Sequence, residues 1–418
     1  MIDIKQPLRR IAIAGALALL TAVPADGQRQ VTRAEADSIA LSAGTRIALA
    51  RADTAAAIAR LLSARVIPNP TLAASYSKAA PQKHVTLDIP VFDALWTRNL
   101  RVGQASASAR AARLLFASER IAALVEVDTT YTRALAADAR FRLSRQTALD
   151  ADSLRKMTVS RRDAGDASDL DVDLATVVAG QQLNVATNDS LSYMTALLTV
   201  QTLMGIPADS IAIVLADSLV YLANDTLLPR RVPDSGALSA SVGTPSITAA
   251  EAALRAAELG IALQKRSTYS LPSISVGVEF GDPGGGEPGY LPLIGLSVPL
   301  PLFNRNQGPV AEARAERDKA QAQLSATRLQ VRQRLVEAAR EREQLIAKIA
   351  RDRDLAIRAQ RVADRSLTAY REGASALPAV LEARRSAREV LGQYIDDLAA
   401  LLTVNTELRA ITQTVPVP

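Results

Sequence analysis

The sequence contains no cysteine and a single histidine, His84, and only 3% of its 418 residues are aromatic. Without cysteine the chain cannot form a disulfide, nor can it carry a lipid on an N-terminal cysteine. One histidine and no cysteine also leave no usual set of transition-metal ligands, so we expect neither a metal nor another cofactor. No pattern of acid, base and nucleophile stands out, which argues against an enzyme.

Apolar residues make up 48% of the chain, although aromatic side chains contribute little to that share. Alanine, leucine and arginine dominate instead, and this composition is typical of long helices packed by small and medium side chains. The formal net charge is only +6. Since no basic cluster is interleaved with aromatic residues, we expect no nucleic-acid surface. The composition therefore predicts a mainly α-helical protein.

Residues 1–27 have the pattern of a secretory signal peptide. A basic stretch precedes an apolar run at 11–23, and small residues follow it. We expect cleavage after Ala25 or after Gly27. The apolar run is shorter than the ~20 residues that a membrane-spanning helix needs. The sequence therefore predicts an exported chain without a helical anchor.

The chain repeats itself at a spacing of roughly 200 residues. Three pairs of segments in the two halves resemble each other in sequence: 87–93 and 298–304, Gly165 and Gly373, and 196–200 and 400–404. We therefore divide the exported chain into a first repeat (28–205), a connection (206–246) and a second repeat (247–418).

Each repeat is predicted to contain a helix, two strands, a long helix and a return helix. The long helices, at 99–163 and 309–372, contain almost no helix-breaking residues. At 1.5 Å per residue each would span roughly 95 Å. The leading helices are expected at 33–66 and 247–265, and the return helices at about 170–204 and 376–412.

The four predicted strands alternate apolar and polar residues, as strands do when one face meets lipid and the other meets water. The apolar positions expected to lie in the membrane include Leu87, Ile89, Val276, Val278, Leu296 and Val298. Four strands cannot close a barrel, and each unpaired backbone group in hydrocarbon costs several kcal/mol. Identical copies must then share the barrel, and three copies would supply twelve strands.

This arrangement resembles the TolC-like outer-membrane efflux proteins over nearly the whole exported chain. The resemblance is carried by Asn69-Pro70 before the first strand, by residues 295–303 before the second long helix, and by the glycine turns at 162–165 and 370–373. Residues 301–305 look most like the metal-cation efflux branch.

The resemblance implies a homotrimer with a β-barrel in outer-membrane lipid and a long periplasmic α-helical barrel. It further implies a channel that works with a periplasmic adaptor and an inner-membrane pump and exports small molecules or metal cations. The alternative is a soluble periplasmic coiled-coil adaptor or structural protein. Strands with two apolar faces would favour that alternative, whereas one apolar and one polar face favours the channel.

The resemblance places Gly165 and Gly373 at the periplasmic tips, where glycine permits the positive φ of a reversal. Its pore gate or acidic ring corresponds here to Asp169, Asp171, Tyr370 and Glu382. The chain departs from the family pattern at Ser375, where a latch arginine can occur, and at Ala379, which can be acidic. The aspartates can also be interpreted as caps at the start of the return helix, where carboxylates are favoured.

Overall fold

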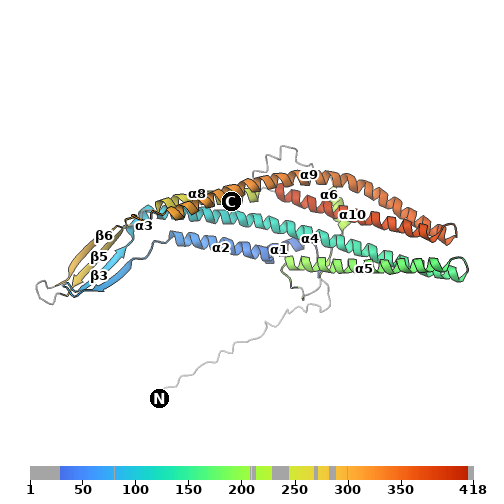
Figure 1. Ribbon diagram of the computed structural model, residues 1–418, viewed down its shortest axis with the longest axis horizontal. Coiled ribbons are helices and arrows are strands. Elements are labelled where there is room, and N and C mark those ends of the chain that lie inside the picture. Colours follow the sequence, from blue (N-terminus) through green and yellow to red (C-terminus); the bar gives the residue numbers. More distant parts are fainter. Residues whose placement is uncertain are drawn as a thin grey trace, which may run out of the picture.

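The computed structural model describes residues 29–79, 81–207, 209, 213–227, 244–267, 272–281, 289–298 and 300–412. The predicted signal peptide lies outside these ranges. The molecule is elongated, with a small sheet at one end and two helical turns at the other (Figure 1). Between them run helices that lie nearly parallel to the long axis.

Two very long helices, α4 (Arg98–Asp163) and α9 (Gln307–Arg371), form the length of the molecule. The return helices α5 (Asp169–Leu203) and α10 (Leu377–Thr412) run back from the far end toward the middle. These four helices confirm the sequence prediction to within about two residues at each end, the usual uncertainty of helix boundaries.

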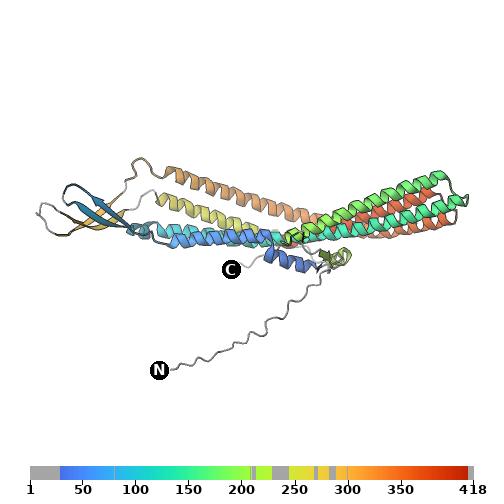
Figure 2. The ribbon, with the colours of Figure 1, turned by 90° about the horizontal axis from the view of Figure 1, so that it is seen from below.

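The helices form a single curved layer whose composition changes half-way along. Toward the turns the order is α5, α4, α10, α9, and α5 and α9 are the outer helices (Figure 1). Toward the sheet the order is α2 (Thr45–Arg65), α4, α8 (Pro245–Arg266), α9. Figure 2 shows α8 and α9 beside α2 and α4 in this half. The layer therefore has two open sides instead of closing on itself.

The predicted single helix at 33–66 is wrong in one respect, because it is interrupted at Gly44. The chain there is extended (φ −60°, ψ 138°) and separates α1 (Arg33–Ala43) from α2. A Cβ at this position would overlap the carbonyl oxygen of Ala40 and lie 3.2 Å from that of Leu203. The interruption therefore occurs where the end of α5 approaches closely.

The sheet has four antiparallel strands in the order β2-β3-β5-β6. Their bounds are Thr71–Tyr76, Lys83–Ile89, Ser273–Phe280 and Leu291–Ser297. The four strands confirm the prediction, but Val298 follows the last residue of β6 and is not part of it. A short helix that the sequence did not predict, α3 (Val91–Trp96), begins directly after Pro90 and redirects the chain from β3 into α4.

A compact segment, here called the collar, packs against the middle of the helices. Here β1 (Arg29–Val31) pairs in parallel with β4 (Ile213–Leu215), and α6 (Leu219–Leu227) follows β4. Both β4 and α6 belong to the predicted connection at 206–246. The main core lies at this level and joins β1, α4, α5, β4 and α10; it includes Val31, Tyr131, Val200, Leu215, Leu398 and Leu401.

A second, smaller core lies near the turns and contains Leu154, Ala175, Tyr370, Leu377 and Val380. It joins α4, α5, α9 and α10. Among the residues that the structure describes, no helix has the length and apolar content needed to cross a membrane.

Candidate functional site

The sheet has one apolar and one polar face. The register aligns Leu72, Leu87, Val276 and Ile294 in one row across all four strands. The next row on that face contains Ile89, Ile274 and Leu296. These side chains are not covered by the chain itself, since Leu72 is 72% exposed and Ile294 80% exposed. This alternation confirms the strand pattern predicted from the sequence.

The opposite face carries paired polar groups. His84 Nδ1 lies 3.0 Å from Glu279 Oε1, between neighbouring positions of β3 and β5. The Ser275 hydroxyl donates to the Asp88 carboxylate. A face lined in this way suits water.

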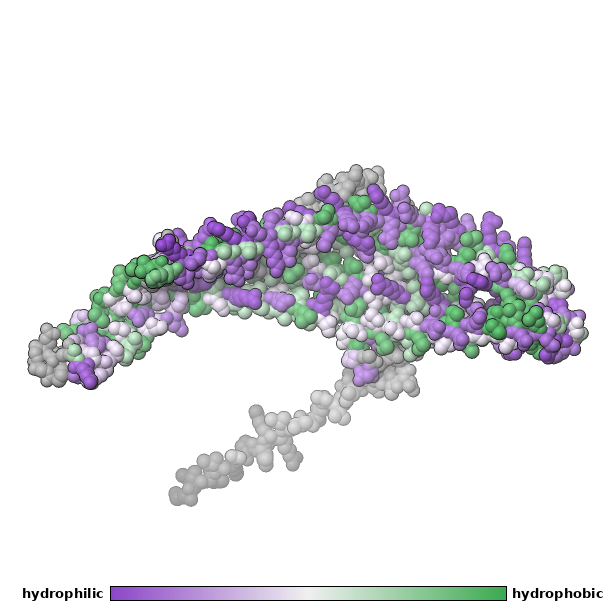
Figure 3. Space-filling view, in the orientation of Figure 1, coloured by the Kyte–Doolittle hydropathy of each residue, from purple (hydrophilic) through white to green (hydrophobic). Residues whose placement is uncertain are grey.

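The outer strands β2 and β6 each have a neighbour on one side only within the described sheet. Their other edges present unpaired backbone N–H and C=O groups, which are available for pairing with another strand. In the space-filling view, apolar side chains also gather where the sheet meets the helices, while hydrophilic side chains cover much of α9 (Figure 3). The exposed apolar residues there include Leu300, Leu302 and Phe303, the last 93% exposed.

The two helical turns at the far end have the same geometry. Gly165 and Gly373 have φ angles of 84° and 76°. In each turn the glycine N–H donates to the carbonyl three residues earlier (2.9 and 3.1 Å). The following N–H donates to the carbonyl five residues earlier (2.8 Å in both turns). This is the hydrogen-bond pattern of a glycine-terminated helix, and both repeats use it.

The two turns are joined through Tyr370, which is only 4% exposed. The Arg161 guanidinium lies 4.7 Å from the centre of its ring and donates to its carbonyl oxygen. The Tyr370 hydroxyl lies 3.2 Å from Thr158 Oγ1. Tyr370 thus packs against α4 within one chain.

The aspartates of the first turn differ from each other. Asp171 accepts from the backbone N–H (3.1 Å) and the hydroxyl (2.8 Å) of Ser168, whose hydroxyl in turn accepts from the Asp171 N–H. This reciprocal arrangement caps α5. Asp169 is largely exposed and lies 3.6 Å from Arg162.

Glu382 is exposed on α10, one turn past the start of that helix. It lines a groove of about 500 Å³ between α10 and the α4–α5 pair. Two arginines of α10 cross this groove: Arg384 lies 3.1 Å from Asp150, and Arg388 donates to Gln182 at 2.7 Å. The structure therefore brings Asp169, Asp171 and Tyr370 to the turns and sets Glu382 apart on the flank of α10.

Replacing either turn glycine by valine should strain the turn without a clash. A Cβ at Gly165 meets nothing within 4 Å, but a β-branched residue at positive φ costs roughly 1–2 kcal/mol. In a trimeric efflux channel of the kind that the sequence resemblance implies, Gly165→Val and Gly373→Val should impair export while trimers still form, as measured by a substrate-resistance assay and by gel filtration. Gly392→Val, in open space within α10, is the control. Normal export by both turn variants would contradict a role for the turns.

The collar contains a buried polar network that the sequence did not predict. The Arg33 guanidinium binds both carboxylate oxygens of Asp128, and Thr406 Oγ1 donates to Asp128 at 3.0 Å. Asp217 accepts from the Arg33 N–H (2.7 Å) and from the Tyr131 hydroxyl (2.8 Å). The network joins α1, α4, α10 and the β4–α6 segment.

Asp37, on the next turn of α1 after Arg33, lines a cavity of about 370 Å³ together with Asp128. Burial and the nearby Asp128 raise the pKa of Asp37 to about 7, although Arg33 acts in the opposite direction. No sequence signal marks these residues, because they come from distant segments.

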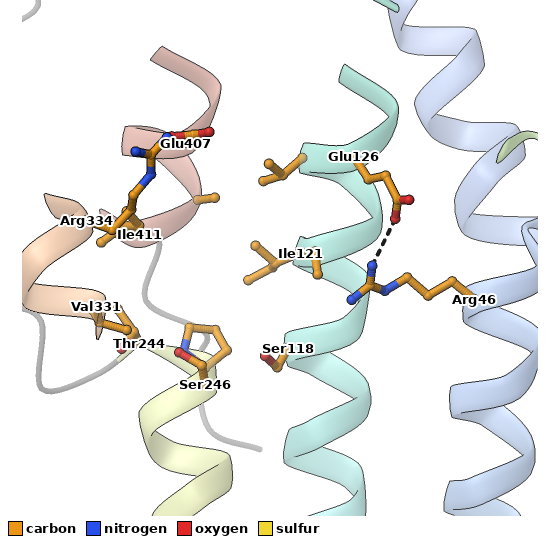
Figure 4. A pocket seen from close by; sticks show the side chains of 14 residues that line it. Arg46, Ser118, Ile121, Glu126, Thr244, Ser246, Val331, Arg334, Glu407 and Ile411 are labelled. Atoms are coloured by element: carbon orange, nitrogen blue, oxygen red, sulfur yellow. Dashed lines mark hydrogen bonds and ion pairs between the residues drawn. The ribbon is translucent and has the colours of Figure 1, made fainter. Parts of the chain in front are cut away.

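A further pocket of about 520 Å³ lies where the end of α10 meets the start of α8 (Figure 4). Its floor is mostly apolar and includes Ile121, Val331 and Ile411. Arg46 pairs with Glu126 at 2.9 Å on one side, and Arg334 pairs with Glu407 on the other. The pocket is therefore a gap in the packing between helix ends, and an ion pair lies on each side of it. Within the described ranges no cluster of three or more potential metal ligands occurs.

The family model described as outer membrane efflux protein matches residues 239–413. The cobalt-zinc-cadmium resistance protein CzcC of Cupriavidus metallidurans is 24% identical over 320 residues, which cover 75% of this chain and 73% of that protein. These matches confirm the predicted resemblance to the TolC-like outer-membrane efflux proteins.

Solved structures agree with this family fold. The chain resembles CusC with a TM-score of 0.72 and 16% identity, covering 98% of both chains. It resembles a membrane protein of Pseudomonas aeruginosa with a TM-score of 0.68 and 20% identity, covering 91% of this chain and 93% of the other. The outer membrane protein VceC of Vibrio cholerae gives a TM-score of 0.69 at 16% identity, over 91% and 96%. The predicted fold class, long helices with four strands per chain, is confirmed for this chain.

Proposed function

We propose that three copies of this chain form the outer-membrane channel of an efflux system, through which small molecules or metal cations pass from the periplasm to the exterior. The observation that carries this proposal is the uncovered apolar face of a sheet with two open edges. Such a sheet is stable in lipid only when neighbouring copies pair its edges and close it. In that closure β2 of one copy pairs with β6 of the next.

The helical layer supports the same closure, because its open sides are complementary in charge. Residues 169–203 of α5 contain four aspartates and no lysine or arginine. Residues 348–371 of α9 contain seven basic and three acidic residues. Exposed apolar side chains lie on both helices and include Leu183, Leu191 and Met194 on α5 and Leu355 and Val362 on α9. In the trimer α5 of one copy would pack against α9 of the next.

In this assembly the sheet lies in the outer membrane, and the helices extend through the periplasm toward an adaptor and an inner-membrane pump. The similarity to a cobalt-zinc-cadmium resistance protein favours metal cations as cargo. The polar face of the sheet agrees with this choice, since Asp88 and Glu279 would give the lumen a negative potential that attracts cations. The alternative, a soluble coiled-coil protein, leaves the apolar face of the sheet unexplained.

The proposal is tested by expressing the full chain and following where it goes. We expect the exported protein in the outer-membrane fraction, extracted by detergent as a trimer, and forming cation-selective pores in planar bilayers. A monomer that stays soluble without detergent would contradict the proposal and favour the coiled-coil alternative.

The acidic residues near the turns have a separate test. If Asp171 and Glu382 narrow or charge the pore entrance, Asp171→Ala combined with Glu382→Ala should raise single-channel conductance or reduce cation preference severalfold. Because Asp171 also caps α5, Ser168→Ala serves as the control, as it weakens the cap by about 1 kcal/mol and keeps the carboxylate. Unchanged conductance in the double variant would contradict a role of both carboxylates in the pore and leave Asp171 with its capping role alone.

A further inference from the structure

The contact between α9 and α10 includes two carboxyl groups beside the main apolar core. Asp397 of α10 is only 4% exposed, and Asp352 of α9 is partly buried. Ile349, one turn before Asp352, and Leu398, next to Asp397, both belong to the core. Carboxylates in such surroundings need hydrogen-bond donors or positive charge.

The two side-chain donors in this contact both bind the same carboxylate oxygen, Asp397 Oδ1. Asp397 Oδ1 accepts from Lys348 Nζ at 2.7 Å and from Gln393 Nε2 at 3.1 Å. Asp397 Oδ2 and Asp352 Oδ2 are both closed to solvent and accept no hydrogen bond. Two ionised carboxylates side by side would repel each other, and Lys348 pairs directly with only one of them. The two buried Oδ2 atoms therefore lack a hydrogen-bond donor.

The electrostatics of the pair fit a shared proton. The hydrogen bond with Asp397 raises the pKa of Asp352, although Lys348 and Arg351 act in the opposite direction. Burial raises the pKa of Asp397, but hydrogen bonds from Asp352, Lys348 and Gln393 outweigh it and lower that pKa. The pKa values of the two carboxyl groups thus move in opposite directions, as in a carboxyl pair that shares one proton.

We propose that Asp352 and Asp397 form a proton-binding site between α9 and α10, with Asp352 protonated through Oδ2 and donating to Oδ2 of Asp397. The site goes beyond the proposed channel function and does not depend on the trimer. While the proton is bound, its hydrogen bond holds α9 and α10 together. When the proton leaves, the two carboxylates are both negatively charged, and their repulsion weakens the contact between α9 and α10.

The stability of the pair should fall as pH rises. An aspartate in the unfolded chain releases its proton near pH ~4. The folded chain retains the Asp352 proton to higher pH. The free energy of unfolding therefore decreases as the pH rises from the pKa of an unfolded aspartate to the raised pKa of Asp352 in the folded chain. Asp352→Asn keeps an N–H donor toward Asp397 and cannot ionise, so this loss disappears.

The experiment compares the melting temperatures of the full-length wild type and Asp352→Asn in detergent from about pH 5 to about pH 9. We expect the variant to gain about 2–4 °C over the wild type across this range. Asp354→Asn, an exposed aspartate on the same helix, should follow the wild type. A constant difference between wild type and Asp352→Asn would overturn the proposal. So would Zn²⁺ or Co²⁺ stabilising the wild type but not Asp352→Asn, because a metal ion would then occupy the site.

Infrared spectroscopy tests the proton directly, even if Asp352→Asn fails to fold. Asp37 is a second candidate for a protonated carboxyl near neutral pH, so the measurement uses Asp37→Asn, in which Asp352 and Asp397 are intact. At about pH 5, where an ordinary aspartate is ionised, this variant should keep the C=O band of a protonated carboxyl, and it should lose the band reversibly at higher pH. A spectrum without that band at about pH 5 would refute the shared proton.

Discussion

Leu87→Arg should remove the protein from the outer membrane, whereas Thr86→Arg, one residue earlier, should leave it there. Leu87 lies on the apolar face of β3 between Leu72 and Val276. Thr86 lies on the polar face, between Ala73 and Gly277. An arginine on the lipid face of a barrel costs about 2–4 kcal/mol at mid-membrane, so three copies would lose roughly 6–12 kcal/mol.

The measurement is the share of protein in the outer-membrane fraction and the share that runs as a trimer in detergent. Expression levels of the two variants are compared before fractionation, so that degradation is not mistaken for failed insertion. If Leu87→Arg inserts as well as Thr86→Arg, the assignment of the two faces is wrong.

The second large effect is expected in the collar, where Asp128→Ala should destabilise the folded chain by about 3–5 kcal/mol. The substitution leaves the Arg33 guanidinium without its carboxylate in a place where its side chain is only 19% exposed. It also removes the acceptor of the Thr406 hydroxyl. Arg33 is the first residue of α1. Losing the Asp128 carboxylate should therefore detach the N-terminal segment from the other helices first.

Glu119→Ala is the matched control for this prediction. Glu119 also lies on α4 and pairs with an arginine, Arg46, but that pair is exposed and Arg46 keeps Glu126 as a partner. Exposed pairs contribute about 0–1 kcal/mol. Thermal unfolding of both variants should therefore differ clearly, and equal losses of stability would show that burial of the Arg33–Asp128 pair contributes nothing.

The sequence predicted the helices and strands because their signals are local. Helices α4 and α9 contain almost no helix breakers beyond their first turns, and the alternation in β3 and β5 fixes which side chains share a face. The turns at Gly165 and Gly373 were predicted because a reversal with positive φ favours glycine.

The features that the sequence did not predict depend on contacts between distant segments. The break at Gly44 occurs where the end of α5 reaches α1, and Arg33, Asp128 and Thr406 meet only after folding. The facing carboxyls of Asp352 and Asp397 look, in sequence, like ordinary surface charges of two helices. Val298 shows a further limit, since its apolar character continues the strand pattern while the strand itself ends at Ser297.

The contact of Arg161 and Thr158 with Tyr370 has a mechanical consequence for the end of the molecule that carries the two turns. It fastens the α4–α5 hairpin to the α9–α10 hairpin within twenty residues of both reversals. A force applied to one hairpin is therefore transmitted to the other, and we expect the two hairpins to move together as one rigid unit. We expect the helices to bend farther from the turns, where the ends of α10 and α8 leave their packing incomplete.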